Sequence, residues 1–201
     1  MKSVVTGVLA GVVTAGAVTS GCGGSGSDAP RAEPTTTHLP TTTIDPWAVP
    51  ATIDAAYAQR ILDEHGRILT AAWRRARRLG KVDAEVERLV RSVESADQAG
   101  SEITGLRREA KARFASLVPD PAVDAGKIVE LRGASPTCIQ VLVRVDISRL
   151  VRSGPVDQTA IELRPARPGE ADRRRNPTGW IEDLRFPPDQ PPLIGSPCAR
   201  S

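Results

Sequence analysis

Apolar residues recur at helical spacing in three successive stretches of the chain. In residues 52–79 they fall mostly three, four or seven positions apart, which predicts an amphipathic helix that Thr52 caps and Gly80 ends. A second helix is expected over residues 83–99, closing before a glycine. A third is expected over residues 101–117, where two prolines follow. All three helices have one apolar face.

The pattern then changes to the alternation of apolar and polar positions that is typical of strands. Short strands are expected over residues 128–132, 137–145, 159–164 and 180–186. The second strand places Ile139, Val141, Val143 and Val145 on one face and Cys138, Gln140, Leu142 and Arg144 on the other. In the fourth strand, Trp180, Leu184 and Phe186 are expected to share the face that packs on the helices.

Helices followed by a meander of strands predict an α+β domain, with three N-terminal helices packed on one side of a four-stranded, mainly antiparallel sheet. This order, over residues 52–186, resembles the NTF2-like cone, in which a curved sheet wraps a long helix. The resemblance implies a ligand cavity between sheet and helix, lined by Trp180 and Tyr57 with Arg144 or Asp146 as polar groups. The alternative is that Trp180 is a core residue, since aromatic side chains carry large apolar area.

The first 49 residues do not have the pattern of a folded domain. Residues 4–18 form a small-residue apolar stretch of the length that a signal peptide needs. The Thr-Ser-Gly-Cys run ending at Cys22 resembles the bacterial lipobox, which implies cleavage of residues 1–21 and diacylation of Cys22. Two or more acyl chains on one cysteine give stable membrane attachment. The alternative is an uncleaved transmembrane anchor, and in either case the domain lies outside the cytoplasmic membrane.

Residues 22–49 are expected to be a tether between the lipidated cysteine and a single α+β domain, residues 50–201. A Gly/Ser stretch is followed by two Thr triplets flanked by prolines, and such a composition cannot bury enough apolar surface to fold. The run Asn176-Pro177-Thr178-Gly179-Trp180, after a Cys-bearing strand, resembles uncharacterised actinobacterial exported lipoproteins. That resemblance implies no known activity.

The two cysteines of the domain, Cys138 and Cys198, are expected to form a disulfide, because an exported domain lies in an oxidising compartment. In the chain-entropy model such a bridge stabilises the domain by about 4 kcal/mol. The alternative is two unpaired thiols.

The formal net charge of +3 is too small and too dispersed for a nucleic-acid-binding surface. Arginines do gather in two places, the end of the first helix and the loop before the last strand. These residues are Arg74, Arg75, Arg77 and Arg78 in the helix, and Arg173, Arg174 and Arg175 in the loop. They are either a solvated face or a contact with anionic lipid headgroups or wall polymers.

No local motif predicts catalysis, a metal site or a cofactor. His65 is the one histidine of the domain, and its acidic neighbours Asp63 and Glu64 point in different directions on a helix, so they do not converge on a metal. Nucleophile elbows and phosphate-binding glycine loops are absent. Three hypotheses follow: a non-catalytic binding or scaffolding module for an unknown envelope component, a carrier of a small apolar ligand or lipid, and an enzyme with no recognisable motif.

Overall fold

Three helices and then four strands follow one another in the part of the chain that the computed structural model describes, residues 45–190 and Cys198. They are α1 (Ala55–Leu79), α2 (Ala84–Val93), α3 (Ala96–Lys111), β1 (Lys127–Ser135), β2 (Cys138–Asp146), β3 (Val156–Pro165) and β4 (Trp180–Phe186), with a short 3-10 turn, η1 (Ile147–Arg149), between β2 and β3. The predicted α+β class is confirmed, although the helices are not at the very N-terminus. The predicted signal peptide, the lipidated Cys22 and the tether up to residue 44 lie outside the described residues.

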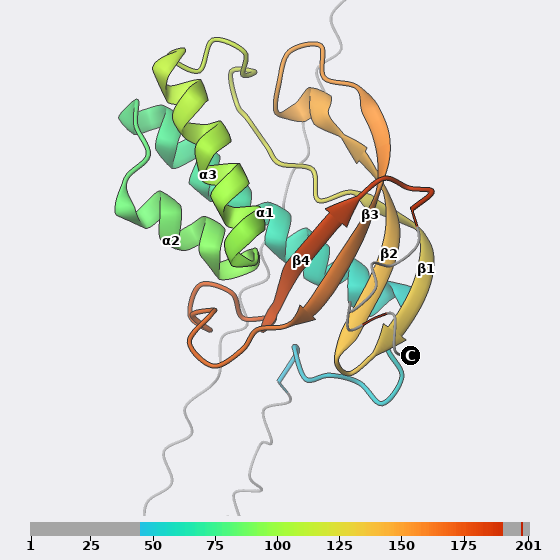
Figure 1. The fold of residues 1–201 in the computed structure, drawn as a ribbon. Coiled ribbons are helices and arrows are strands. Elements are labelled where there is room, and N and C mark those ends of the chain that lie inside the picture. The colour runs from blue at the N-terminus through green and yellow to red at the C-terminus, as the bar shows by residue number, and fades with distance from the viewer. Residues whose placement is uncertain (1–44, 191–197, 199–201) are drawn as a thin grey trace, which may run out of the picture. The chain divides into compact units, whose positions relative to one another are not determined.

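The strands form one antiparallel meander in the order β1-β2-β3-β4. Figure 1 shows α1 lying along one side of this sheet, with α2 and α3 grouped at one end of α1. Alternation along β2 is as predicted, because its four isoleucine and valine residues at positions 139–145 all belong to the core beneath α1. None of the helices among residues 45–190 is long and apolar enough to cross a membrane.

The two halves of α1 belong to two different cores. Its first half buries Ile61 and Leu62 against the sheet and Trp180. Its second half buries Ile68 and Trp73 among α2 and α3. Burial of one aliphatic side chain stabilises a fold by about 1.5 to 3 kcal/mol, so α1 is the element that joins the sheet to the helices.

The helix ends differ from the predicted ones where a better capping group lies nearby. Asp54, not Thr52, caps α1, because its side chain accepts a hydrogen bond from Tyr57 N at 2.7 Å. The predicted end at Gly80 is confirmed, with a left-handed φ of 66°. Asp83 caps α2 through Val86 N.

The boundary between the second and third helices was predicted wrongly. It falls at Glu94 and Ser95, and Gly100 lies inside α3. This helix ends at Lys111 and does not reach residue 117, because Arg113 and Phe114 both have φ of 54°. These two residues turn the chain so that Phe114 enters the helical core.

A β-bulge in β4 changes which side chains face the helices. Leu163 of β3 pairs with Glu182, whereas the preceding residue of β3, Glu162, pairs with Leu184, so Asp183 is the extra residue. Cross-strand partners share a face of the sheet. Leu184 therefore lies on the face away from the helices, and so does Phe186, which pairs with Ala160. The prediction that these two residues share the face of Trp180 is wrong.

Candidate functional site

The bulge brings two charged residues of β4 to the helix-facing side of the sheet. Glu182 pairs with Leu163 and Arg185 pairs with Ile161, and both partners belong to the core beneath α1. Without the extra residue, Arg185 would lie on the opposite face from Glu182, because side chains alternate along a strand. Arg185 donates from Nε to Glu182 Oε1 at 2.8 Å and from a terminal nitrogen to Oε2 at 3.0 Å.

The junction between α2 and α3 is tied to the same segment of β4. Ser95 donates a backbone hydrogen bond to Glu182 O at 2.8 Å and a hydroxyl hydrogen bond to Asp183 O at 3.0 Å. Glu94 and Glu182 also form an isolated parallel β-bridge. These contacts fix the Glu94 side chain beside Glu182, at the point where the helices meet the sheet.

Glu94 is a buried carboxyl group with an unpaired oxygen. The residue is only 8% exposed, and its Oε2 has no hydrogen-bond partner among the described residues. Burial raises the pKa of Glu94 to about 9, and the negative charges of Glu182 and Glu102 act in the same direction, whereas Arg185 opposes them. Glu94 is therefore held protonated at neutral pH.

Glu102, on α3, is the third carboxyl group of this cluster. Its Oε1 accepts a hydrogen bond from Trp73 Nε1 on α1 at 2.6 Å. Burial raises the pKa of Glu102 above its ordinary value, although the bond from Trp73 opposes that shift. Helices α1 and α3, the α2–α3 junction and β4 thus contribute to a cluster in which one buried carboxyl oxygen has no partner among the described residues.

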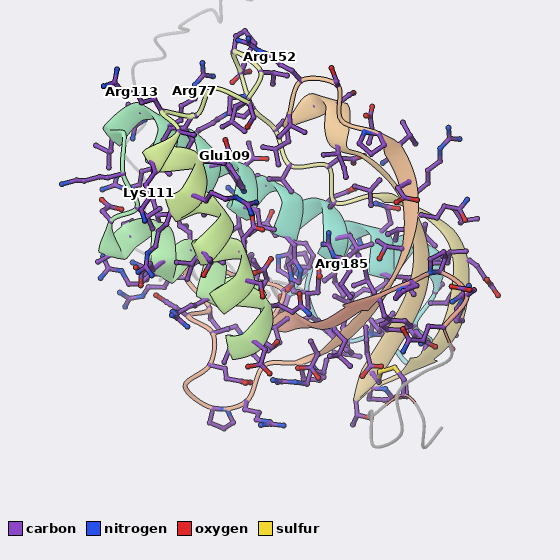
Figure 2. All side chains as sticks on the ribbon, turned by 45° about the horizontal axis from the view of Figure 1, so that its top comes forward. Arg77, Glu109, Lys111, Arg113, Arg152 and Arg185 are labelled. Carbon is purple, nitrogen blue, oxygen red and sulfur yellow. A yellow bond between two sulfur atoms is a disulfide. The ribbon has the colours of Figure 1, made fainter. Side chains whose placement is uncertain are left out.

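The cluster lies in a cleft of about 440 Å³ between the helices and the sheet. Figure 2 shows Arg185 in the space between α3 and the sheet, and Glu109 on α3 above it. The apolar part of the wall comes from α1 and from the chain around η1, and it includes Leu69, Trp73, Val145 and Leu150. A volume of this size is within the usual range of sites for small molecules.

Acidic side chains outnumber basic ones in the wall of the cleft, although the chain as a whole carries a net charge of +3. The acidic residues are Glu94, Glu102, Glu109, Asp124, Asp146 and Glu182, and the basic residues are Arg108 and Arg185. Neither a histidine nor a cysteine of the described residues lines the cleft. The carboxylates are therefore its main chemical groups.

Close packing of α1 sets the position of one wall. A Cβ atom at Gly66 would meet Ala125 Cβ at 2.9 Å and Val123 O at 3.2 Å. Asp124, between those two residues, accepts a hydrogen bond from Asp146 N at 2.6 Å. The absence of a side chain at Gly66 thus allows the segment that carries Asp124 to lie directly against the helix.

The predicted cavity residues do not line a common site. Tyr57 and Trp180 are buried in the core, where Trp180 Nε1 donates to Tyr57 Oη at 3.1 Å. Arg144 is exposed on the other face of the sheet. Only Asp146 lines the cleft, and hydrogen bonds from Ser148 lower its pKa. Trp180 thus has the alternative role, that of a core residue.

The Asn176–Trp180 run has a structural role that its sequence did not show. Asn176 is fully buried, and its amide donates to Ser92 O and to Trp180 O, each at 2.7 Å. Its Oδ1 accepts from the hydroxyl of Thr178 at 2.7 Å. The run therefore fixes the loop before β4 to the end of α2.

His65 belongs to this network and not to a metal site. It is 4% exposed, and its Nε2 lies 2.9 Å from Trp180 O. Burial lowers the pKa of His65 to about 4, although Glu182 acts in the opposite direction. His65 is therefore neutral at physiological pH, with Nε2 as the hydrogen-bond donor to the carbonyl.

The arginine clusters are extensively paired with groups of the domain itself. Arg74 pairs with Asp120 and Arg75 with Asp83, while Arg77 donates to the carbonyl groups of residues 118 and 119. In the later cluster Arg173 donates to Pro177 O, and Arg175 pairs with Asp172 and with Glu85. Arg78 and Arg174 are exposed. Figure 2 shows Arg77, Arg113 and Arg152 at one end of the domain.

Cys138 and Cys198 lie together as expected for a disulfide, with their sulfur atoms joined and their Cα atoms 5.4 Å apart. Within the described residues these sulfurs and Glu162 are also the one group of three donors close enough for a metal. Sulfurs that are bonded to each other are not thiolate ligands. The carboxyl groups of the cleft do not form such a group in the described part of the chain.

The carboxyl cluster was missed in the sequence because its members, at positions 94, 102 and 182, are far apart in the chain and glutamate is common on surfaces. One signal was present: Glu182 stands two residues after Trp180, on the same alternating face.

Comparisons with protein-family models, curated proteins and solved structures found no match to this chain.

Proposed function

We propose that the protein is a cell-surface lipoprotein whose domain is a non-catalytic binding module, with its ligand site in the acidic cleft. The observation that carries this proposal is the unpaired Glu94 carboxyl oxygen, buried in a cleft of about 440 Å³. A buried polar group without a partner costs about 1 to 3 kcal/mol. A ligand that forms a hydrogen bond with Glu94 would offset this cost.

The lipid anchor at Cys22 and the extracytoplasmic location rest on the lipobox resemblance and belong to the same proposal. Replacing Cys22 with alanine is expected to release the domain from membranes or to leave an unprocessed precursor. Metabolic labelling with a radioactive fatty acid, followed by fractionation, measures both effects. Unchanged labelling and an unchanged membrane fraction in the Cys22→Ala protein contradict the assignment.

An NTF2-like arrangement is also part of the proposal. It is supported by a long helix that lies along one side of an antiparallel sheet and by a cleft between the two layers. The cleft lies farther along α1 than the cavity first predicted. Its apolar wall favours the second hypothesis, a carrier of apolar ligands, whereas its carboxyl groups favour a polar or charged ligand.

Two glycines of α3 provide a matched test of the cleft. Gly105 lines it, Gly100 does not, and an added Cβ atom would meet nothing within 4 Å at either position. Leucine at Gly105 is expected to fill the cleft, whereas leucine at Gly100 leaves it open. The full chain is titrated with n-butylamine, n-butanol and butyrate by calorimetry and by tryptophan fluorescence, to which Trp73 in the wall of the cleft contributes. The site is supported if any of the three compounds binds, Gly105→Leu abolishes that binding and Gly100→Leu preserves it. It is refuted if the binding is unchanged by both substitutions.

A further inference from the structure

The charge of the cleft limits the chemistry of its ligand. Six acidic residues and two arginines line it. One of the arginines, Arg185, already donates to both carboxylate oxygens of Glu182, which compensates its charge. An anionic ligand would therefore meet uncompensated carboxylates, and repulsion between like charges opposes its binding.

The unpaired oxygen of Glu94 is the second, independent observation. This oxygen is buried, Glu94 is one of the residues that line the cleft, and the described residues provide no hydrogen-bond partner for the oxygen. A ligand with N–H groups can supply a donor to this oxygen once Glu94 is ionised. A protonated amine supplies three N–H donors and a positive charge, which is the combination that a carboxylate binds most strongly.

The apolar wall indicates what the amine is attached to. Leu69, Trp73, Val145 and Leu150 lie in the same cleft as the carboxyl groups. We propose that the cleft binds a small organic cation, a primary ammonium group on a short apolar chain, with the ammonium beside Glu94 and the chain along Leu69 and Leu150. This inference rests on the proposed function and names the ligand class of the same site.

Binding of a cation is coupled to release of a proton. Empty, the Glu94 carboxyl is protonated at neutral pH, because its pKa is about 9. An ammonium group beside it favours the ionised form, so the proton leaves as the cation enters. Affinity is therefore expected to rise with pH between 7 and the pKa of the empty site. The charged groups that face Glu94 are Glu182 and Arg185 from β4 and Glu102 from α3, and α1 contributes Trp73.

The experiment compares three probes of one size, n-butylamine, n-butanol and butyrate, on the full chain by isothermal titration calorimetry. We expect butylamine to bind at least about tenfold more tightly than butanol, since a hydrogen bond to a charged group contributes about 1.5 to 3 kcal/mol. Butyrate is expected not to bind. Titrations in two buffers of different ionisation enthalpy measure the proton released on binding.

Two variants separate Glu94 from the general charge of the cleft. Glu94→Gln keeps the shape, and we expect it to weaken butylamine about tenfold or more and to abolish proton release. Glu109→Gln removes a charge from the same wall, but Glu109 accepts a hydrogen bond from Ser116, so its affinity change is expected to stay below about threefold. Equal effects of the two variants overturn the assignment to Glu94.

The outcomes also separate this inference from the proposed function. If butanol or butyrate binds as tightly as butylamine and Gly105→Leu abolishes that binding, the proposal of a cationic ligand is wrong, but the cleft remains the binding site. If none of the three probes binds and the tryptophan fluorescence does not change, both the inference and the proposed function are overturned.

Discussion

Two groups of buried polar side chains lie on the helix-facing side of β4, and they differ in how completely they are hydrogen-bonded. Around Trp180, the amide of Asn176 and the hydroxyl of Thr178 have partners within the domain. Around Glu94, a carboxyl oxygen has none among the described residues. Buried polar groups in proteins are nearly always paired. The first group therefore stabilises the fold, whereas the second is the place where we propose that a ligand binds.

One atom of the first group departs from this contrast. His65 Nδ1 is buried without a partner in the described residues. In the neutral imidazole that donates from Nε2, this atom is an acceptor. His65 also differs from Glu94 in position, because Glu94 lines the cleft and His65 does not. The following predictions test the comparison, from the largest expected effect to the smallest.

Replacing Asn176 with alanine is expected to lower the free energy of unfolding by about 4 kcal/mol, because it removes the amide donor to Ser92 O, one of the donors to Trp180 O and the acceptor of the Thr178 hydroxyl. Urea denaturation measures the loss. Arg174→Ala, in the exposed part of the same loop, is the control and is expected to change stability by less than about 0.5 kcal/mol. A loss below about 1 kcal/mol would show that the network around Trp180 does not stabilise the fold.

Acid is expected to destabilise the domain through His65. Its pKa is about 4 in the folded protein and 6.5 ordinarily, so the unfolded state binds the proton more readily. The stability present above pH 6.5 is therefore lost as the pH falls toward 4, by about 3 kcal/mol in all. Urea denaturation across this range measures it. The experiment uses the Glu94→Gln background, because Glu94 has the opposite pH dependence between about 4.5 and 6.5.

The control for that measurement is His65→Gln in the same background. Glutamine does not titrate, and its amide can donate to Trp180 O. Carboxylates such as Glu85 and Glu170, whose ion pairs with arginines lower their pKa, contribute equally to both proteins. If the two proteins lose the same stability between pH 6.5 and 4, His65 is not the group responsible.

Glu94→Gln is expected to stabilise the domain at pH 8, in contrast to Asn176→Ala. The folded protein holds a proton on Glu94 up to a pKa of about 9, whereas the unfolded chain releases it near the ordinary value of 4.5. Stability therefore falls as the pH rises through this interval. Glutamine is neutral in both states, so we expect the Tm to rise by about 5 °C at pH 8 and to be unchanged at pH 4.5. Equal thermal shifts at the two pH values would refute this account.

The fold was predictable where local pattern decides it. The alternation in β2 and the helical spacing in α1 both follow from burial of one face, and both were confirmed. The bulge at Asp183 was not predictable, because an inserted residue leaves no trace in the order of apolar side chains. The helix boundary at Ser95 was hidden by Gly100, which is a breaker by propensity and is tolerated inside α3.

The site depended on these unpredicted features. Glu94 stands at the missed boundary and Arg185 stands beyond the missed bulge, so neither could be placed beside Glu182 from the sequence. Sequence reasoning placed the cavity at Trp180, where a large aromatic residue fills the space instead. Local irregularities of the backbone thus decide which charged side chains meet.

Gly66 lets α1 and the segment that carries Asp124 pack together with no side chain between them. A methyl group at this position would force the segment that carries Asp124 away from α1. The cleft would then be expected to widen near Leu69 and Val123. The width of the cleft thus depends on the absence of one carbon atom, the Cβ atom of residue 66. A variant with alanine at position 66 is expected to bind a larger ligand.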